Sequence, residues 1–260
     1  MQMDRKNIMI NLDAGELSVL VNGDAKTIPL GTKEAFDIVG KIWLRAGWDV
    51  KYLYSFTWLG RPILQLPDDL VRLQEIVWSI EPDLIIETGV AHAGSLVFFA
   101  SLLHVRGRGL VVGVEKGLMD STRAAVKSHP LSKYMSIIEG SSTDATIVKK
   151  IEKVVERHSK VLVFLDSNHS YQHVLDELNI YSKFVSEGSW IIACDGIIGE
   201  FKGAPRVPVD AENNNATEAA KEFLRLNPEF ELLDPPLIFN ESAITCSPTY
   251  WRGGFLRKRR

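Results

Sequence analysis

The sequence has few cysteines, little net charge and no long apolar run. Its two cysteines, Cys194 and Cys246, are too few for a disulfide framework and lack the paired spacing of a zinc site. The net charge of −3 gives no overall attraction to nucleic acid or to an anionic membrane. No stretch approaches the roughly 20 apolar residues of a membrane helix, and the polar Met1–Lys6 is not followed by a signal-peptide core. These absences predict a cytoplasmic protein without a membrane span or a nucleic-acid partner.

The chain is long enough for one α/β domain with additions. It has 260 residues, of which 45% are hydrophobic and 24% are charged. We divide it into an N-terminal extension or cap, residues 1–66, and a main domain, residues 67–260. In the extension, Leu17–Val21 suggests a strand and Lys33–Trp48 a helix, and we expect this segment to pack on the main domain. The basic end, Arg257–Arg260, is interpreted as a solvated tail, with an acidic partner or membrane surface as the alternative.

From residue 67 onward, short apolar runs alternate with amphipathic segments. This alternation predicts an α/β fold, a Rossmann-like, doubly wound, mostly parallel sheet with helices on both faces. Ligands of such a sheet bind at the carboxyl ends of its strands. The expected strands lie at Leu84–Ile86, Leu110–Glu115, Met135–Ile138, Val161–Asp166, Trp190–Asp195, Phe230–Leu233 and Gly254–Leu256. Three of the expected helices begin at Pro67, Ser95 and Asp120. Two more contain Ile147 and Val174, and the second of these extends to Val185. A last helix follows a cap at Thr217.

The stretch Leu84–Leu96 reads as a strand, a tight turn and the start of a helix. Gly89 allows a sharp turn or a close approach to a ligand, and Gly94 allows close packing where the helix begins. This arrangement is typical of a nucleotide-type cofactor site.

Four acids lie at the carboxyl ends of four of the expected strands: Glu87, Glu115, Asp166 and Asp195. The carboxyl ends of neighbouring parallel strands meet along one edge, so we expect the four carboxylates to gather in one crevice. An acid in the position of Glu115 can accept hydrogen bonds from both hydroxyls of a ribose. That role suits NAD and S-adenosylmethionine equally. The loop after Glu87 lacks the G-x-G-x-x-G spacing that holds a pyrophosphate, which favours S-adenosylmethionine.

The two acids at the ends of adjacent strands, Asp166 and Asp195, could share a hard cation such as Mg²⁺. The alternative is that each accepts hydrogen bonds from backbone N–H groups of its own turn. His169 lies just beyond Asp166 and could take a proton from a substrate hydroxyl, or it could cap the next helix. His92, in the glycine loop, is the weaker candidate for a contact with cofactor or substrate.

The sequence resembles the cephalosporin hydroxylase family, a group similar to class I S-adenosylmethionine-dependent O-methyltransferases. The resemblance rests on four segments and runs from about Trp58 to the C-terminus. The most specific of the four contains the Asp-Ser-x-His-Ser pattern. The segments are Pro82–Gly89 with Gly94 and Ser95, Glu139–Asp144, Leu165–Leu178, and Phe255–Lys258.

The resemblance implies roles for individual residues. Glu87, Gly89 and Ser95 would line the methionine end of the cofactor, and Glu115 would hold its ribose. Gly140, Ser141 and Ser142 would lie near the adenine, with Asp166 also at the cofactor. Some members hold Mg²⁺ through an aspartate matching Asp166 and a consecutive acidic pair. Here Cys194 precedes Asp195 in place of the first acid, and a thiol is a poor ligand for a hard cation. Glu200 is a candidate substitute.

We therefore predict an S-adenosylmethionine-dependent O-methyltransferase for a hydroxyl of a sugar or other small natural product. Either a metal on Asp166 and Asp195 or direct proton removal by His169 would activate that hydroxyl. Three alternatives remain: a non-catalytic scaffold, an NAD-dependent dehydrogenase, and an iron-dependent hydroxylase, although no histidine has a His-x-Asp or His-x-Glu spacing. The tryptophan-bearing N-terminal region and the loop 199–216 are the expected walls of the acceptor pocket. The oligomeric state is left open, with a homo-oligomer as one alternative.

Overall fold

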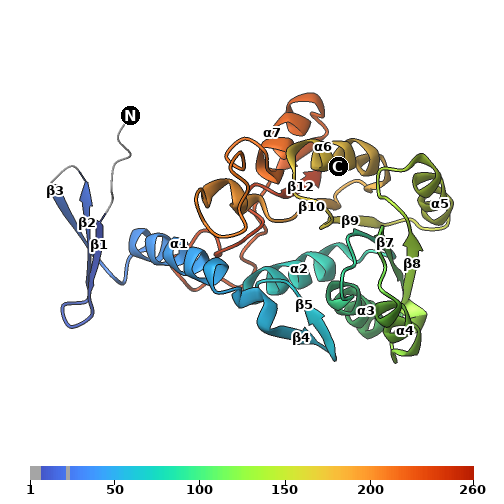
Figure 1. The fold of residues 1–260 in the computed structure, drawn as a ribbon, viewed down its shortest axis with the longest axis horizontal. Coiled ribbons are helices and arrows are strands. Elements are labelled where there is room, and N and C mark those ends of the chain that lie inside the picture. Colours follow the sequence, from blue (N-terminus) through green and yellow to red (C-terminus); the bar gives the residue numbers. More distant parts are fainter. Residues whose placement is uncertain (1–6, 22–23) are drawn as a thin grey trace.

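A seven-stranded sheet forms the centre of the computed structural model, which describes residues 7–21 and 24–260. Its strand order is β11-β12-β10-β9-β6-β7-β8 (Figure 1). The strands from β10 to β8 are parallel, and β12 pairs antiparallel with both β10 and β11. The predicted mostly parallel, doubly wound sheet is confirmed. The strands are β6 (Leu84–Thr88), β7 (Leu110–Glu115), β8 (Met135–Glu139), β9 (Val161–Leu165), β10 (Trp190–Ala193), β11 (Phe230–Leu232) and β12 (Phe255–Lys258).

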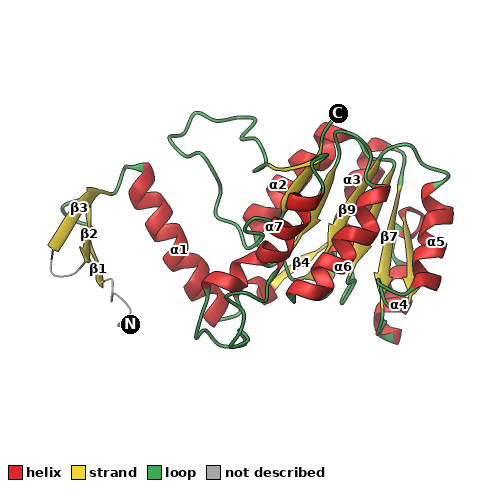
Figure 2. Ribbon diagram, turned by 90° about the horizontal axis from the view of Figure 1, so that it is seen from above, coloured by secondary structure: helices red, strands yellow, loops and turns green. Residues whose placement is uncertain are grey.

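Helices cover both faces of this sheet (Figures 1 and 2). One layer consists of α2 (Pro67–Ile80), α3 (Gly94–Arg106) and α4 (Asp120–Ser128). The opposite layer consists of α5 (Ala145–Val155), α6 (Tyr171–Tyr181) and α7 (Ala216–Leu226). Strand β6 shows why the sequence reads as a continuous apolar run. Ile85 belongs to the core under α2 and α3, whereas Leu84 and Ile86 belong to the core under α5 to α7.

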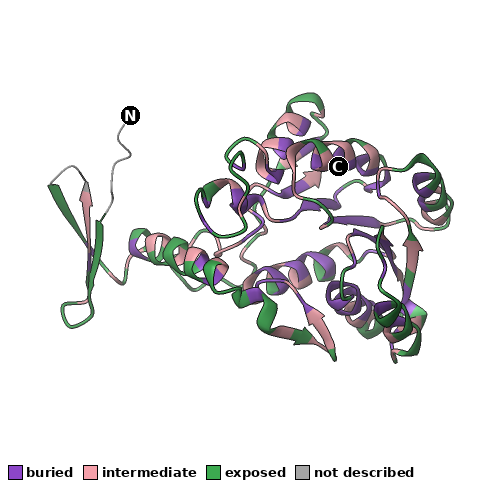
Figure 3. Cartoon of the chain, viewed as in Figure 1, coloured by how far each residue is buried: buried purple, intermediate pink, exposed green. Residues whose placement is uncertain are grey.

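The buried residues follow these two layers, and the N-terminal extension is largely exposed (Figure 3). The elements of the extension are β1 (Asn7–Asn11), β2 (Glu16–Val21), β3 (Asp24–Pro29), α1 (Lys33–Asp49), β4 (Phe56–Trp58) and β5 (Arg61–Ile63). The antiparallel β1–β2–β3 sheet projects away from the main body (Figure 1). From α1 onward the extension packs on the main body, and the Trp48 indole donates a hydrogen bond of 2.8 Å to the Pro205 carbonyl. The expectation that the extension packs on the main domain therefore holds from α1 onward and is wrong for the β1–β3 sheet.

The extension packs closely against the main body at the start of α3. A Cβ atom at Gly94 would overlap the carbonyl oxygen of Pro62. This explains the glycine that the sequence places where α3 begins. The division of the chain into domains at residues 66 and 67 stays a prediction, and Met1–Lys6 lies outside the described residues.

Several local expectations differ from the structure. Asn215, not Thr217, caps α7, because its side chain accepts the Glu218 N–H, while the Thr217 hydroxyl bonds the carbonyl of Arg252. Helix α6 ends at Tyr181, before Val185, because a short 3₁₀ helix follows it. The basic Arg257–Arg260 is not a free tail, since its first two residues belong to β12. Within the described ranges, 7–21 and 24–260, no helix is long and apolar enough to cross a membrane.

Candidate functional site

A cavity of about 190 Å³ opens at the carboxyl ends of β6, β7, β9 and β10. Its walls come from the glycine loop after β6, from the ends of the other strands and from the N-terminal extension. Three of the four strand-end acids face it. The lining residues are Leu53, Tyr54, Pro62, Leu64, Gln65, Gly89, Val90, Ala91, His92, Gly94, Ser95, Glu115, Asp166, Ser167, His169 and Asp195.

Glu115 is held in the ionised form by the loop that it faces. One of its carboxylate oxygens accepts the N–H groups of Val90 and Ala91, at 2.9 and 3.0 Å, and the other accepts that of Gly117 at 3.0 Å. Burial opposes ionisation, but the backbone hydrogen bonds prevail and lower the pKa of Glu115. The oxygen that accepts the Gly117 N–H has a second lone pair. Glu115 can therefore both fix the loop and accept a hydroxyl of a ligand.

Glu87 lies beneath the cavity rather than on its wall, with no exposed surface. The Ser95 hydroxyl donates to one of its oxygens, and the other oxygen has no partner among the described residues. Burial raises the pKa of Glu87 to about 8, with the Glu115 charge adding to the shift. A buried carboxyl with one unpartnered oxygen is suited to a cationic group, which would relieve the cost of its ionisation.

Asp166 and Asp195 face the opposite end of the cavity. The Gln65 amide donates to the Oδ2 atom of Asp166 at 2.7 Å. Burial and the neighbouring charges of Asp195 and Glu87 raise the pKa of Asp166, and burial also raises that of Asp195. Asp195 has φ 59°, in the left-handed region that non-glycine residues rarely adopt. This strained turn aims the Asp195 carboxyl into the cavity instead of continuing β10.

His169 completes this group. Its Nε2 atom lies 3.4 Å from the Oδ2 atom of Asp195, and both side chains are partly exposed. A carboxylate beside one ring nitrogen orients an imidazole and stabilises its protonated form. His92 also lines the cavity, but its side chain forms none of the hydrogen bonds found in the described residues, and its carbonyl accepts from Arg61. The arrangement thus distinguishes His169 from His92.

The donor set for a metal is smaller than the resemblance implies. Among the described residues, no group of three or more histidine, cysteine, aspartate or glutamate side chains is arranged to hold a metal ion. Burial raises the pKa of the Cys194 thiol, which is hydrogen-bonded to Asp166. Glu200, the candidate substitute, is instead paired with Arg252 at 3.2 Å. Asp166 and Asp195 remain as two carboxylates. Proteins commonly hold Mg²⁺ through one or two carboxylates, with water and substrate completing the coordination.

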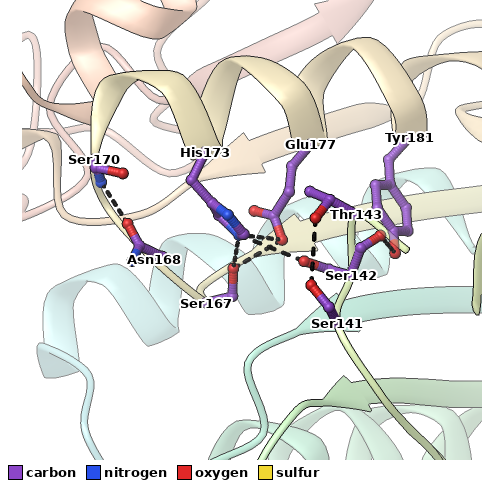
Figure 4. Close-up of polar contacts among 9 residues, drawn as sticks. All are labelled: Ser141, Ser142, Thr143, Ser167, Asn168, Ser170, His173, Glu177 and Tyr181. Carbon is purple, nitrogen blue, oxygen red and sulfur yellow. Dashed lines mark hydrogen bonds and ion pairs between the residues drawn. The ribbon is translucent and has the colours of Figure 1, made fainter. Parts of the chain in front are cut away.

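The remaining candidates lie elsewhere. Gly140, Ser141 and Ser142 follow β8 and do not line the cavity. Ser141 and Ser142 lie near Ser167 and the side chains of α6 (Figure 4). Of the two expected acceptor walls, the N-terminal region does line the cavity, although through residues other than its tryptophans, whereas no residue of the loop 199–216 does.

Sequence reasoning missed Gln65 in the cavity wall and, outside the cavity lining, the buried Asp69. Gln65 interrupts the apolar run Ile63–Leu66, and a lone amide in such a run was the signal that could have identified it. Asp69 is 1% exposed near the start of α2 and accepts the Tyr250 N–H at 3.0 Å. Burial raises its pKa to about 8. As the second of two acids at a helix start, Asp69 reads from the sequence as an ordinary first-turn carboxylate.

The chain is similar to several known proteins. Among curated proteins, the rhamnosyl O-methyltransferase of Mycobacterium tuberculosis (strain ATCC 25618 / H37Rv) is 28% identical over 153 residues, which are 58% of this chain and 60% of that protein. The rhamnosyl O-methyltransferase of Mycobacterium leprae (strain TN) is 30% identical over 152 residues, 58% of this chain and 64% of that protein. The matches therefore span less than two thirds of the length of these relatives.

Two solved structures of CmcI share the fold. One, with S-adenosylhomocysteine, has a TM-score of 0.54 at 16% identity and covers 80% of this chain and 84% of that chain. Another, described with Mg and S-adenosylmethionine, has a TM-score of 0.53 at 17% identity and covers 80% of this chain and 78% of that chain. The profile of the family described as rhamnosyl O-methyltransferase/CmcI matches residues 50–259. The chain belongs to this family, which confirms the resemblance.

Proposed function

We propose that the protein is an S-adenosylmethionine-dependent O-methyltransferase that acts on a hydroxyl of a sugar or another small natural product. The observation that carries this proposal is the His169–Asp195 pair, which shares one cavity with Glu115 and the glycine loop. A base for a hydroxyl and a ribose-type acid thus lie in the same site. The names of the mycobacterial relatives and the cofactors of the CmcI structures support the same activity.

The cofactor roles are assigned by chemistry. Glu87 and Ser95, with the close-packed Gly89, suit the ammonium end of the methionine moiety, and Glu115 suits the ribose. Gly140–Ser142 and Asp166 would complete the adenine side and the methyl-donor end. The cavity of about 190 Å³ is smaller than the roughly 300–1,000 Å³ of typical ligand sites. We therefore expect the wall from the N-terminal extension, which includes Tyr54 and Gln65, to move outward when ligand enters.

The chain's own residues would prepare the acceptor. S-adenosylmethionine, when bound, supplies a sulfonium methyl group as the electrophile. His169 removes the proton of the acceptor hydroxyl at Nδ1, the ring nitrogen that does not face Asp195, and Asp195 holds the imidazole in position from its Nε2 side. The cavity walls align the acceptor oxygen with the methyl carbon and exclude water, and such alignment supplies much of the rate of a transfer between two bound groups.

Mg²⁺ is proposed as an optional second cofactor. Asp166 and Asp195 are the residues that would hold it, with water and the acceptor supplying further oxygens. It would lower the pKa of the acceptor hydroxyl. Cys194 would contribute nothing to it, because its buried thiol has a raised pKa and stays protonated. The iron-dependent hydroxylase is disfavoured, because the described residues contain no two-histidine, one-carboxylate group.

For partners and location we propose a cytoplasmic protein that acts on small molecules and not on nucleic acid, in line with its net charge of −3. We also propose that it forms a homo-oligomer. The projecting β1–β3 sheet supports this, since the small core that it shares with the start of α1 contains only Leu17, Ile28 and Ala35 among the buried residues described, while Ile8, Met9 and Ile10 are exposed.

Methyl transfer to a panel of hydroxylated acceptors, including rhamnosides, tests the proposal. Purified protein is incubated with isotopically labelled S-adenosylmethionine, and the products are separated and counted. Transfer to at least one acceptor oxygen is expected. Cofactor binding without transfer to any acceptor would instead favour the non-catalytic scaffold.

A further inference from the structure

One face of α6 carries three polar side chains that reach the loops after β8 and β9. His173, Glu177 and Tyr181 are four residues apart, so they lie above one another on the same side of the helix. The Tyr181 hydroxyl donates to the Ser142 carbonyl at 2.8 Å. Figure 4 shows all three pointing toward the same pair of loops. The helix therefore contacts two loops of the proposed cofactor site at once.

The hydrogen bonds converge on the Nε2 atom of His173 (Figure 4). It lies 2.9 Å from the Ser167 hydroxyl and 3.4 Å from the Ser142 hydroxyl, and 3.3 Å from the Oε1 atom of Glu177. The Ser167 hydroxyl also lies 2.7 Å from Oε1 of Glu177 and donates to it. Because the only hydrogen of that hydroxyl points to Glu177, the Ser167 oxygen can only accept a hydrogen bond from His173. Nε2 of His173 must then carry a hydrogen.

Glu177 makes the contact of His173 with the two loops an interaction between charged groups. Its side chain is 1% exposed, and one of its oxygens has no partner among the described residues. His173 is the neighbouring side chain that offers a positive charge, and its hydrogen bond to Glu177 raises the pKa of the imidazole. Loss of His173 would leave a buried carboxylate with the Ser167 hydroxyl alone, which is costly in a poorly solvated position.

Ser167 connects this cluster to the site. It lines the cavity and directly follows Asp166, whose carbonyl packs against Gly89 of the cofactor-type loop. Ser142 belongs to the loop that begins at Gly140, where the backbone N–H bonds the Glu115 carbonyl at 2.9 Å. A shift at His173 would therefore be transmitted to the ends of β7, β8 and β9 together.

We propose that His173 and Glu177 are positioning residues that join the 140–143 loop to the 166–168 loop and so hold the wall of the cofactor site on the β8 side. This inference rests on the proposed function. Neither side chain lines the cavity, so they act through Ser142 and Ser167. A cofactor that extends from Glu115 toward these loops binds tightly only when the two loops are held together.

The test is a calorimetric titration of the full chain with S-adenosylhomocysteine, on wild type and on His173→Leu, His173→Gln and Glu177→Gln. His173→Leu removes the donor and is expected to weaken binding roughly tenfold. The amide of His173→Gln can place an N–H near the Nε2 position and is expected to restore affinity to within about threefold of wild type. Glu177→Gln keeps the shape but removes the charge, and we expect binding about threefold weaker.

The matched control is His158→Leu. His158 is also partly buried, but it bonds the Val154 carbonyl at 2.8 Å at the far end of α5. This variant is expected to bind like wild type. Circular dichroism of each variant checks that it is folded, and Glu177→Gln decides the matter if His173→Leu does not fold.

The outcomes separate the two proposals. If wild type binds no S-adenosylhomocysteine, the proposed function fails. If wild type binds, the positioning role is overturned by folded His173→Leu and Glu177→Gln variants that bind within a factor of about two of wild type. It is also overturned if the glutamine variant at position 173 loses as much affinity as the leucine variant, because a donor-specific role requires rescue.

Discussion

The Nε2 atom of His169 lies 3.4 Å from the Oδ2 atom of Asp195, at the edge of the cavity that also contains Glu115. If His169 is the base, His169→Asn lowers the rate of methyl transfer by about 10²–10⁴-fold. Affinity for S-adenosylhomocysteine should change by less than about threefold, since the side chain acts on the acceptor. Single-turnover transfer assays and calorimetry measure the two effects separately.

His92→Asn is the matched control for this prediction, because His92 lines the same cavity and lacks a carboxylate partner among the described side chains. Its transfer rate should stay within a few-fold of wild type. Equal losses in both variants would mean that the acid partner of His169 is irrelevant to the reaction.

The buried carboxyl of Glu87 leads us to expect that cofactor binding depends on pH. Burial raises its pKa to about 8 in the free protein, so the carboxyl is protonated below that pH. An ammonium group beside it favours the ionised form, and binding should release a proton below about pH 8. Affinity for S-adenosylhomocysteine should therefore rise with pH from about 6 to 8, by at most about tenfold per pH unit, and level off above 8.

Calorimetry in buffers with different ionisation enthalpies detects this proton release directly. In Glu87→Gln the release should disappear and the affinity should fall, because the amide cannot pair with an ammonium. Proton uptake, or unchanged release in the glutamine variant, would show that Glu87 does not meet the cationic end of the cofactor.

An aspartate in place of Cys194 is expected to strengthen metal binding. It is 1% exposed and next to Asp166 and Asp195, both of which already have raised pKa values. Cys194→Asp adds a third acid, so the variant should melt at a lower temperature than wild type in EDTA. Mg²⁺ should then raise its melting temperature by more than it raises that of wild type, because the added oxygen is a hard ligand.

Cys194→Ser serves as the control, since it changes the sulfur to oxygen without adding charge and should respond to Mg²⁺ like wild type. Scanning calorimetry in EDTA and in millimolar Mg²⁺ gives the shifts. If the aspartate variant gains no more than the serine variant, the two aspartates do not face a common cation.

Gly94 predicts a large effect of one methyl group on stability. A Cβ there would meet Pro62 and Ile63, so Gly94→Ala has to separate β5 from the start of α3. Overpacking of this kind costs about 1–3 kcal/mol in the free energy of unfolding. Gly117→Ala is the comparison, because no atom lies within 4 Å of its added Cβ. Urea unfolding of both variants would contradict the account if their losses were equal.

The central sheet was predictable because its signal is local. The buried strands β6 and β9 are uninterrupted apolar runs, and each is followed by an amphipathic helix. The meeting of Glu115, Asp166 and Asp195 in one cavity follows from the parallel sheet, because the carboxyl ends of its strands lie along one edge. The antiparallel return of β12, which includes Arg257, depends on long-range pairing that no local pattern encodes.

The parts of the site that could not be predicted depend on contacts between distant segments. Gln65 reaches Asp166 across 101 residues of sequence, and outside the cavity lining the buried Asp69 accepts from Tyr250 across 181 residues. A contact between distant segments also decides that Asn215 and not Thr217 caps α7, because the Thr217 hydroxyl donates its hydrogen bond to the Arg252 carbonyl. His173 carries no local signal that separates it from a surface histidine; only the structure shows the two loops that it joins.

The most direct test of the proposed activity is a calorimetric titration of the purified full chain with S-adenosylmethionine, and with NAD⁺ as the comparison ligand. The site predicts saturable binding of S-adenosylmethionine, because Glu87 and Glu115 suit its ammonium and ribose, and no binding of NAD⁺, because the loop has no pyrophosphate spacing. Absence of heat with S-adenosylmethionine, or saturable binding of NAD⁺ in its place, would contradict the assignment.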